Sequence, residues 1–261
     1  MQEKIEDKKI LFITGLHRSG TSKLHSVLRS HPRISGFRNT GVSRDEGQHL
    51  QSVYPTAEPY GGPGIFGFDS RAYLDENSPL LTPANREKLL DEWLPHWDLS
   101  KDILVEKSPP HLIRTRFLQT FFPAAAFLFI LRHPLATALA TQKWSETSID
   151  RLLEHWLLCH EAMYSDKEKL HKYLIFAYEK MVSAPGNTFQ EIFDFLKIPS
   201  LTPTDIRDDN RKYFRKRNMR YLAFLYGGMR RRLTKKYEER INRFGYSLLD
   251  LTKYPVTEIH S

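Results

Sequence analysis

The chain has 261 residues, of which 40% are hydrophobic and 27% charged, a composition typical of globular proteins. No apolar run approaches the roughly 20 residues that span a membrane, and the charged start of the chain lacks the apolar core of a signal peptide, so we expect a cytoplasmic protein. The single cysteine, Cys159, excludes an intrachain disulfide and a thiolate zinc site.

The formal net charge of +8 is concentrated in one part of the chain. Residues 211–243 hold thirteen Lys and Arg against two Glu, a local charge of +11, so the remaining residues together carry −3. A basic region of this kind suits a polyanionic partner. One hypothesis is therefore a non-catalytic protein that binds a polyanion such as nucleic acid.

In chain order, the first predicted element is a short strand that ends before Gly15. A polar turn leads to Gly20, a helix is predicted over 23–30, and a second apolar stretch follows at 34–37. Residues 54–83 are rich in Pro and Gly, which predicts a long loop without regular structure. We expect this loop to act as a lid over a substrate.

The later part of the chain alternates between helices and strands. Helices are predicted over 83–97, from after His111 to about Phe122, from Pro134 onward, over 149–165 and over 185–196. Strands are predicted over 103–106, 127–131 and 173–176. This alternation predicts an α/β fold, with one domain over 1–261 and a central parallel sheet flanked by helices. Its core covers about 9–200, and a basic helical C-terminal region covers about 203–245.

The turn between Gly15 and Gly20 has the spacing of a phosphate-binding P-loop. A strand before it and a helix after it let backbone N–H groups converge on an anion at the helix N-terminus. The lysine that a Walker A motif needs is Thr21 here, whereas Arg18 places a cation inside the loop. A nucleotide or small-molecule kinase therefore stays an alternative, disfavoured by that missing lysine and by the lack of a clear strand ending in a magnesium-binding Asp.

This loop resembles the 5′-phosphosulfate loop of sulfotransferases that use 3′-phosphoadenosine-5′-phosphosulfate (PAPS). The matching residues are His17, Arg18, Ser19, Gly20, Thr21 and Ser22, and their Arg-Ser-Gly-Thr core is similar to that of tyrosyl-protein sulfotransferases. The resemblance implies that these residues bind the 5′-phosphate and that Arg18 also stabilises the leaving group. It further implies PAPS as co-substrate, no metal, and a small-molecule, glycan or peptide acceptor with a hydroxyl or amine.

A second motif, Phe129 to Pro134, resembles the 3′-phosphate motif of the same family and implies that Arg132 contacts that phosphate. The family places a serine eight residues further on, where this chain has Ala140, so Thr141 or Thr137 is the substitute hydroxyl. Sulfotransferases also close over the 3′-phosphate with cations from a late loop, for which Arg215 and Lys216 are the candidates.

Two further segments resemble the family. Glu106–Pro109 is similar to the segment with the catalytic lysine, which implies that Lys107 contacts the sulfuryl group, and Tyr178 matches a tyrosine that helps to hold the nucleotide. Arg18, Lys107, Arg132 and Tyr178 all follow predicted strands, which agrees with ligand binding beyond the carboxyl ends of a parallel sheet. The loop and Lys107 favour an enzyme over a nucleic-acid binder.

The resemblance does not assign the general base. The positions that correspond to the family's histidine and glutamate bases are Pro109 and Asn39. An acidic and histidine-bearing segment at 41–51 supplies Glu46 and His49 instead. We rank Glu46 first, His49 second and His111 third.

Overall fold

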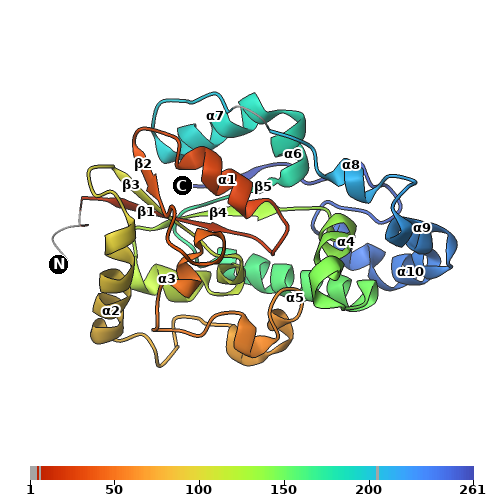
Figure 1. Cartoon of the computed structure of the whole chain (residues 1–261), viewed down its shortest axis with the longest axis horizontal. Helices are drawn as coiled ribbons and strands as arrows, with labels where there is room; N and C mark the ends of the chain where they lie inside the picture. The colour runs from red at the N-terminus through yellow and green to blue at the C-terminus, as the bar shows by residue number, and fades with distance from the viewer. Residues whose placement is uncertain (1–4, 6, 204–205) are drawn as a thin grey trace.

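The computed structural model describes residues 5, 7–203 and 206–261, and a six-stranded sheet forms its centre (Figure 1). The strands in spatial order are β2 (Ile34–Gly36), β3 (Ile103–Lys107), β1 (Lys9–Thr14), β4 (Ala126–Leu131), β5 (Tyr173–Ala177) and β6 (Glu258–His260). The first five are parallel, and β6 runs antiparallel to β5. The predicted parallel sheet is thus confirmed, with one antiparallel edge strand that the sequence did not reveal.

The central strands form because their apolar residues are buried on both faces of the sheet. In β4 the five residues Phe127–Leu131 are each 0% exposed. In β1 the register pairs Leu11 with Val105 of β3 on one side and with Ala126 of β4 on the other. Strand β1 therefore lies in the middle of the sheet. The glycine-bounded turn follows its carboxyl end, so it lies at the middle of the edge that the carboxyl ends of the strands form.

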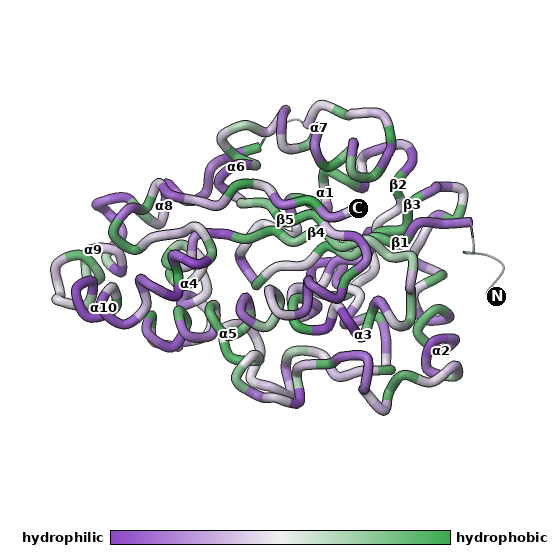
Figure 2. Tube along the Cα trace, turned by 180° about the vertical axis from the view of Figure 1, so that it is seen from behind, coloured by the Kyte–Doolittle hydropathy of each residue, from purple (hydrophilic) through white to green (hydrophobic). Residues whose placement is uncertain are grey.

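Helices cover both faces of the sheet, as predicted (Figure 1). One face packs against α1 (Thr21–Leu28), α6 (Tyr178–Ser183) and α7 (Pro185–Leu196). The other packs against α2 (Pro83–Trp93), α3 (Thr115–Phe121), α4 (Pro134–Ser145) and α5 (Ile149–Lys167). Figure 2 shows the apolar residues gathered along the strands between these two layers.

The predicted helix over 83–97 is shorter than expected, because its α-helical part ends at Trp93 and a 3₁₀ turn, η7 (Leu94–His96), follows. Pro95 explains this end, since a proline ring removes a helix hydrogen bond. The long segment 54–82 has neither α-helix nor strand, as predicted. It does contain three 3₁₀ turns, which are η4 (Glu58–Tyr60), η5 (Phe66–Phe68) and η6 (Ser70–Ala72).

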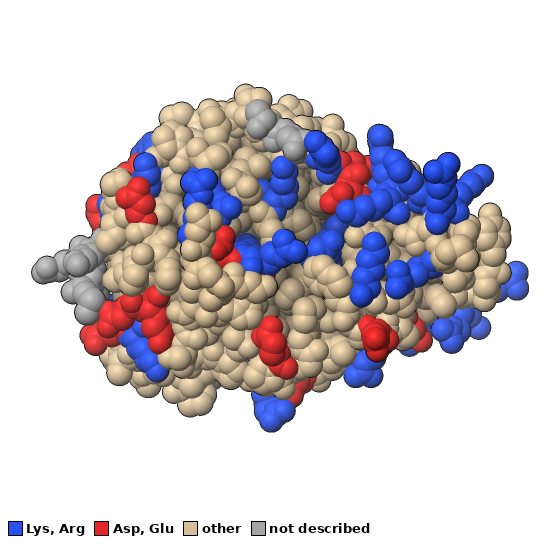
Figure 3. Space-filling model, viewed as in Figure 1, with Lys and Arg blue, Asp and Glu red and all other residues tan. Residues whose placement is uncertain are grey.

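The basic C-terminal region folds as α8 (Asn210–Tyr213), α9 (Met219–Tyr226) and α10 (Met229–Asn242). Figure 3 shows the Lys and Arg side chains concentrated at this end of the molecule. Some of the charge is structural, because Arg240 forms ion pairs of 2.8 Å with Glu154 and with Glu161 of α5. Residues 204 and 205 of the predicted region lie outside the described residues.

No helix in the described ranges has the length and apolarity needed to cross a bilayer.

Buried histidines predict a strong pH dependence of stability. Burial lowers the pKa to about 4 at His17, His133 and His160, and to about 3 at His25 and His155. The unfolded chain, with histidine pKa values near 6.5, therefore binds more protons than the folded chain below that pH. Stability present above pH ~6.5 should be lost as the pH falls toward ~4. Urea unfolding at a series of pH values would show this, whereas a flat profile between pH ~7 and ~5 would contradict the neutral state of these rings.

Candidate active site

Polar residues from four parallel strands meet at one edge of the sheet. The loop from Gly15 to Gly20 follows β1, Lys107 is the last residue of β3, Arg132 follows β4, and Tyr178 follows β5. Because the carboxyl ends of parallel strands share an edge, this placement agrees with the expected position of a ligand site. A cleft of about 390 Å³ lies here, lined among others by Arg18, Gly20, Thr21, Ser22, Arg44, Arg132, Tyr178 and Asp209. Figure 3 shows Lys and Arg side chains around a hollow in the middle of this face.

The loop needs glycine at both ends because other parts of the chain approach it closely. A Cβ atom on Gly15 would lie 2.4 Å from the carbonyl oxygen of Ile130, and one on Gly20 would lie 2.7 Å from the Tyr178 ring. Gly20 also has a left-handed φ of 107°. It precedes α1, whose first N–H groups have no cap from a described side chain. Those donors are left for a ligand at the helix N-terminus.

Three buried polar atoms around the cleft have no hydrogen-bond partner within the described part of the chain. They are Ser19 Oγ, Arg18 Nε and Arg132 Nη2. Buried polar groups are nearly always paired, so unsatisfied donors gathered at one place indicate a site for an anionic ligand. The Arg18 guanidinium is held over the Trp144 ring, 4.4 Å from its centroid, at the rim of the loop.

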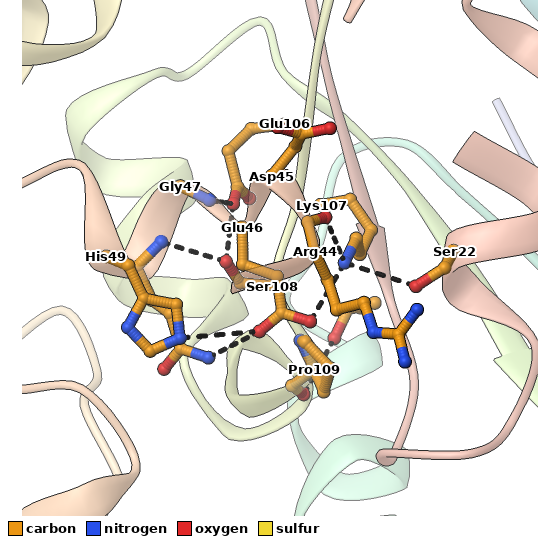
Figure 4. Close-up of polar contacts among 12 residues, drawn as sticks. Ser22, Arg44, Asp45, Glu46, Gly47, His49, Glu106, Lys107, Ser108 and Pro109 are labelled. Carbon is orange, nitrogen blue, oxygen red and sulfur yellow. Dashed lines mark hydrogen bonds and ion pairs between the residues drawn. The ribbon is translucent and has the colours of Figure 1, made fainter. Parts of the chain in front are cut away.

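Lys107 is 0% exposed and contacts two of the residues that line the cleft, Ser22 and Arg44 (Figure 4). Its ammonium donates to Glu46 Oε1 at 2.8 Å, to the Arg44 carbonyl oxygen at 3.1 Å and to Ser22 Oγ at 3.4 Å. These partners use all three N–H donors of the lysine. The ammonium thus joins the phosphate loop to the segment with the predicted base.

Glu46 is held in place by its own segment. Gln48 Nε2 donates to Glu46 Oε2 at 2.7 Å, and Gln48 Oε1 accepts from the Ala57 N–H at 3.1 Å. The preceding residues, Arg44 and Asp45, have left-handed φ values of 57° and 51°. This turn brings Glu46 to Lys107 although Glu46 does not match the family's glutamate position in sequence.

The other candidate bases lie differently. His49 Nε2 is 3.9 Å from Glu46 Oε2, beside the first-ranked candidate. His111 is 0% exposed and faces away from the cleft, with Nε2 2.9 Å from the Tyr54 hydroxyl and Nδ1 2.8 Å from Glu106 Oε2.

Glu106 is a supporting residue to which sequence reasoning gave no role. Its buried carboxylate accepts from the Gly47 N–H at 2.9 Å and from Ser108 Oγ at 2.5 Å, and Ser108 Oγ accepts from the Gln48 N–H at 3.0 Å. A Cβ atom on Gly47 would lie 2.5 Å from Glu106 Oε1. The signal was an acidic residue inside an otherwise apolar strand, which needs polar partners because buried charges are paired.

Arg132 lies between the loop and the C-terminal region. Its Nη1 donates to the Arg18 carbonyl oxygen at 2.6 Å and its Nε to Asn210 Oδ1 at 2.7 Å. The guanidinium stacks over the Tyr178 ring at 4.3 Å from the centroid. The Tyr178 hydroxyl accepts from the Asp209 N–H at 2.9 Å. Sequence reasoning missed Asp209 and Asn210, which carry no motif.

Five predicted binding residues are not among those that line the cleft. Ser19 is buried within the loop, and Thr141 and His17 line a separate small cavity between the loop, α4 and α5, together with Gly64 and Thr137. Arg215 lines a neighbouring cavity beside α8, and Lys216 is exposed to solvent. The substitute hydroxyl predicted at Thr141 therefore does not reach Arg132 in this structure.

The fold and the cleft define an α/β protein with a cleft suited to an anionic ligand at the carboxyl edge of its sheet. The chain belongs to the sulfotransferase family, since residues 11–203 match that family over more than half of the sequence. The resemblance inferred from the motifs is thus confirmed. Among the described residues, no group of three or more His, Cys, Asp and Glu is placed to hold a metal ion.

A curated protein is similar to this chain in sequence, and a solved structure is similar in fold. The chain is 26% identical over 204 residues to protein-tyrosine sulfotransferase 1 of Danio rerio, a match that covers 74% of this chain and 54% of the relative. The chain thus spans about half the length of that curated protein. The sulfotransferase STF9 of Mycobacterium avium has a similar fold, with a TM-score of 0.57 and 14% identity over 94% of this chain and 79% of that one.

The buried Lys107–Glu46 pair generates a stability prediction. Lys107→Ala leaves the Glu46 carboxylate, whose side chain is 8% exposed, without its cation and should destabilise the fold by about 3 kcal/mol. Glu46→Gln added to Lys107→Ala should recover much of that loss, because the amide carries no charge. A urea double-mutant cycle measures this coupling, and strictly additive losses would show that the pair contributes nothing as a pair.

Proposed function

We propose that this protein transfers a sulfuryl group from PAPS to a hydroxyl or amine acceptor. The observation that carries the proposal is the Lys107 ammonium, which contacts both Ser22 of the phosphate loop and the Glu46 carboxylate. A cation that touches both groups suits a reaction in which a leaving group departs on one side and an acceptor loses a proton on the other.

The cleft fits the donor in charge and in its unsatisfied atoms. Ser19, Arg18 and the first N–H groups of α1 would hold the 5′-phosphate, and Arg132 Nη2 would hold the 3′-phosphate. PAPS supplies the activated sulfuryl group. The loop as a whole acts through preorganised donors, which stabilise charge without moving during the reaction.

Each catalytic side chain has one task. Glu46 accepts the acceptor proton as the acceptor's oxygen or nitrogen bonds to sulfur. Lys107 donates to the bridging oxygen, which keeps the electron pair when its bond to sulfur breaks. The 3.4 Å contact from Lys107 to Ser22 is the longest of its three, so it is the one that a bound donor replaces most easily. Arg18 offsets the charge that remains on the 5′-phosphate.

The acceptor is proposed from chemistry and from a relative. The Danio rerio relative is named a protein-tyrosine sulfotransferase, so a tyrosine hydroxyl in a peptide is the acceptor to test first. Small-molecule and glycan hydroxyls are the other candidates. His49 and the loop over 54–82 lie on the Glu46 side, where an acceptor would have to approach the base.

Ligand binding separates this proposal from the kinase and the polyanion binder. Adenosine 3′,5′-bisphosphate without magnesium should raise the melting temperature, because a ligand at a hundredfold its dissociation constant adds about 2.7 kcal/mol of stability. ATP with magnesium should have little effect. Thermal denaturation with each ligand checks this. Stabilisation by ATP with magnesium alone would favour the kinase, and stabilisation by nucleic acid alone would favour the binder.

Glu46→Gln tests the base. The amide keeps an oxygen for Lys107 but accepts no proton, so nucleotide binding should persist while turnover falls by about 10²–10⁴-fold. Release of adenosine 3′,5′-bisphosphate from PAPS with a tyrosine peptide measures turnover, and calorimetry measures binding. His49→Gln is the matched comparison. Normal turnover of Glu46→Gln together with an inactive His49→Gln that still binds nucleotide would transfer the role to His49.

A further inference from the structure

No hydroxyl of α4 among the described residues hydrogen-bonds the Arg132 side chain, since the Thr137 hydroxyl donates to the Arg132 backbone carbonyl oxygen at 3.5 Å. Ala140 occupies the position where the family has a serine and is 0% exposed, and Thr141 faces a different cavity. Arg132 therefore takes its orientation from other residues. Asn210 hydrogen-bonds its side chain from the C-terminal region, and it lies beyond residues 11–203, the part that matches the family.

We infer that Asn210 is the positioning residue for Arg132 and thereby sets the preference of this protein for nucleotides that carry a 3′-phosphate. The inference rests on the proposed function, because it concerns the same donor site. It assigns a role to the first residue of α8.

The contacts of Arg132 leave one part of its guanidinium available. Nε donates to Asn210 Oδ1 at 2.7 Å and Nη1 to the Arg18 carbonyl oxygen at 2.6 Å, while Nη2 has no partner among the described residues. The rings of Tyr178 and Tyr213 lie 4.3 Å and 5.4 Å from the guanidinium carbon. With Nε and Nη1 anchored, the fork cannot rotate freely, and Nη2 keeps a fixed direction for a phosphate oxygen.

Asn210 is itself held in a single orientation. Its Nδ2 donates to Glu179 Oε1 at 2.6 Å, and its backbone N–H donates to Asp208 Oδ1 at 2.8 Å. Glu179 also accepts from the His133 N–H and the Tyr246 hydroxyl, each at 3.0 Å. Burial raises the pKa of the Glu179 carboxyl, which makes these three donors important for its charged form.

The amide suits this position because it is neutral and has both a donor and an acceptor. Its oxygen orients Arg132 without cancelling the positive charge that a phosphate requires. A carboxylate at position 210 would neutralise the charge of Arg132. It would also offer no N–H donor to Glu179, so two negative carboxylates would face each other. Asn210 is 7% exposed and Arg132 is 4% exposed, so water does not readily replace either contact.

The test compares two nucleotides that differ in the 3′-phosphate. Calorimetry with adenosine 3′,5′-bisphosphate and with adenosine 5′-phosphosulfate is carried out on the unaltered protein, Asn210→Asp and Asn210→Ser. Both variants should weaken the bisphosphate by about tenfold or more and leave the phosphosulfate within about twofold, because Asp neutralises the charge of Arg132 and the shorter Ser loses the hydrogen bond to that charged group. Asn218→Asp is the matched control, because it makes the same change at the N-cap of α9 in the same region and has no contact with Arg132.

A second arm shows whether Asn210 acts through Arg132. In an Arg132→Ala background, Asn210→Asp and Asn210→Ser should change affinity for the bisphosphate no further. Equal losses for both nucleotides, or the same loss with and without Arg132, would mean a structural role and overturn the inference. Asn210 variants that keep the original ratio of affinities for the bisphosphate and the phosphosulfate would also overturn the inference. Failure of the unaltered protein to bind the bisphosphate would instead contradict the proposed function itself.

Discussion

A buried ammonium group joins the two halves of the site. Lys107 has no exposed surface, and the carboxylate it contacts is also buried, so neither charge is stable without the other. The pair fixes the distance between the phosphate loop after β1 and the segment that follows β2. Its position at the end of β3 depends on the central strands, whose apolar residues set the register of the sheet. The geometry of the proposed chemistry therefore derives from packing in the core.

Local sequence patterns predicted the parts of the structure that follow from one stretch of chain. The strand–loop–helix around Gly15 and Gly20, the Arg132 strand end and the helix over 185–196 all have a local signature, and the structure contains each of them. The position of Glu46 required tertiary information. Left-handed residues before it and an ion pair of 3.2 Å between Arg29 and Asp45 shape the turn that brings it to Lys107.

Residues supplied by distant segments left no signal in the sequence. Glu106 accepts from the backbone N–H of Gly47 and Asn210 accepts from the side chain of Arg132, both far away in the chain, and a lone Glu or Asn is common in any protein. The excess of basic residues in 211–243 was visible in the sequence, but the ion pairs that some of them form were not. Ion pairs to α5, such as those of Arg240, show that part of that charge holds the C-terminal helices to the rest of the fold. The sequence alone offered two roles for it, binding of a polyanion and closure over the 3′-phosphate, and did not indicate these ion pairs.

The most direct test is a crystal structure with adenosine 3′,5′-bisphosphate. We expect the 5′-phosphate on the N–H groups at the start of α1 and on Ser19, the 3′-phosphate within hydrogen-bond distance of Arg132 Nη2, and Lys107 near the vacated sulfuryl position. A nucleotide bound in the opposite direction, or bound away from the loop, would contradict this expectation. Either result would show that the contact of Lys107 with Ser22 and Glu46 serves the fold rather than sulfuryl transfer.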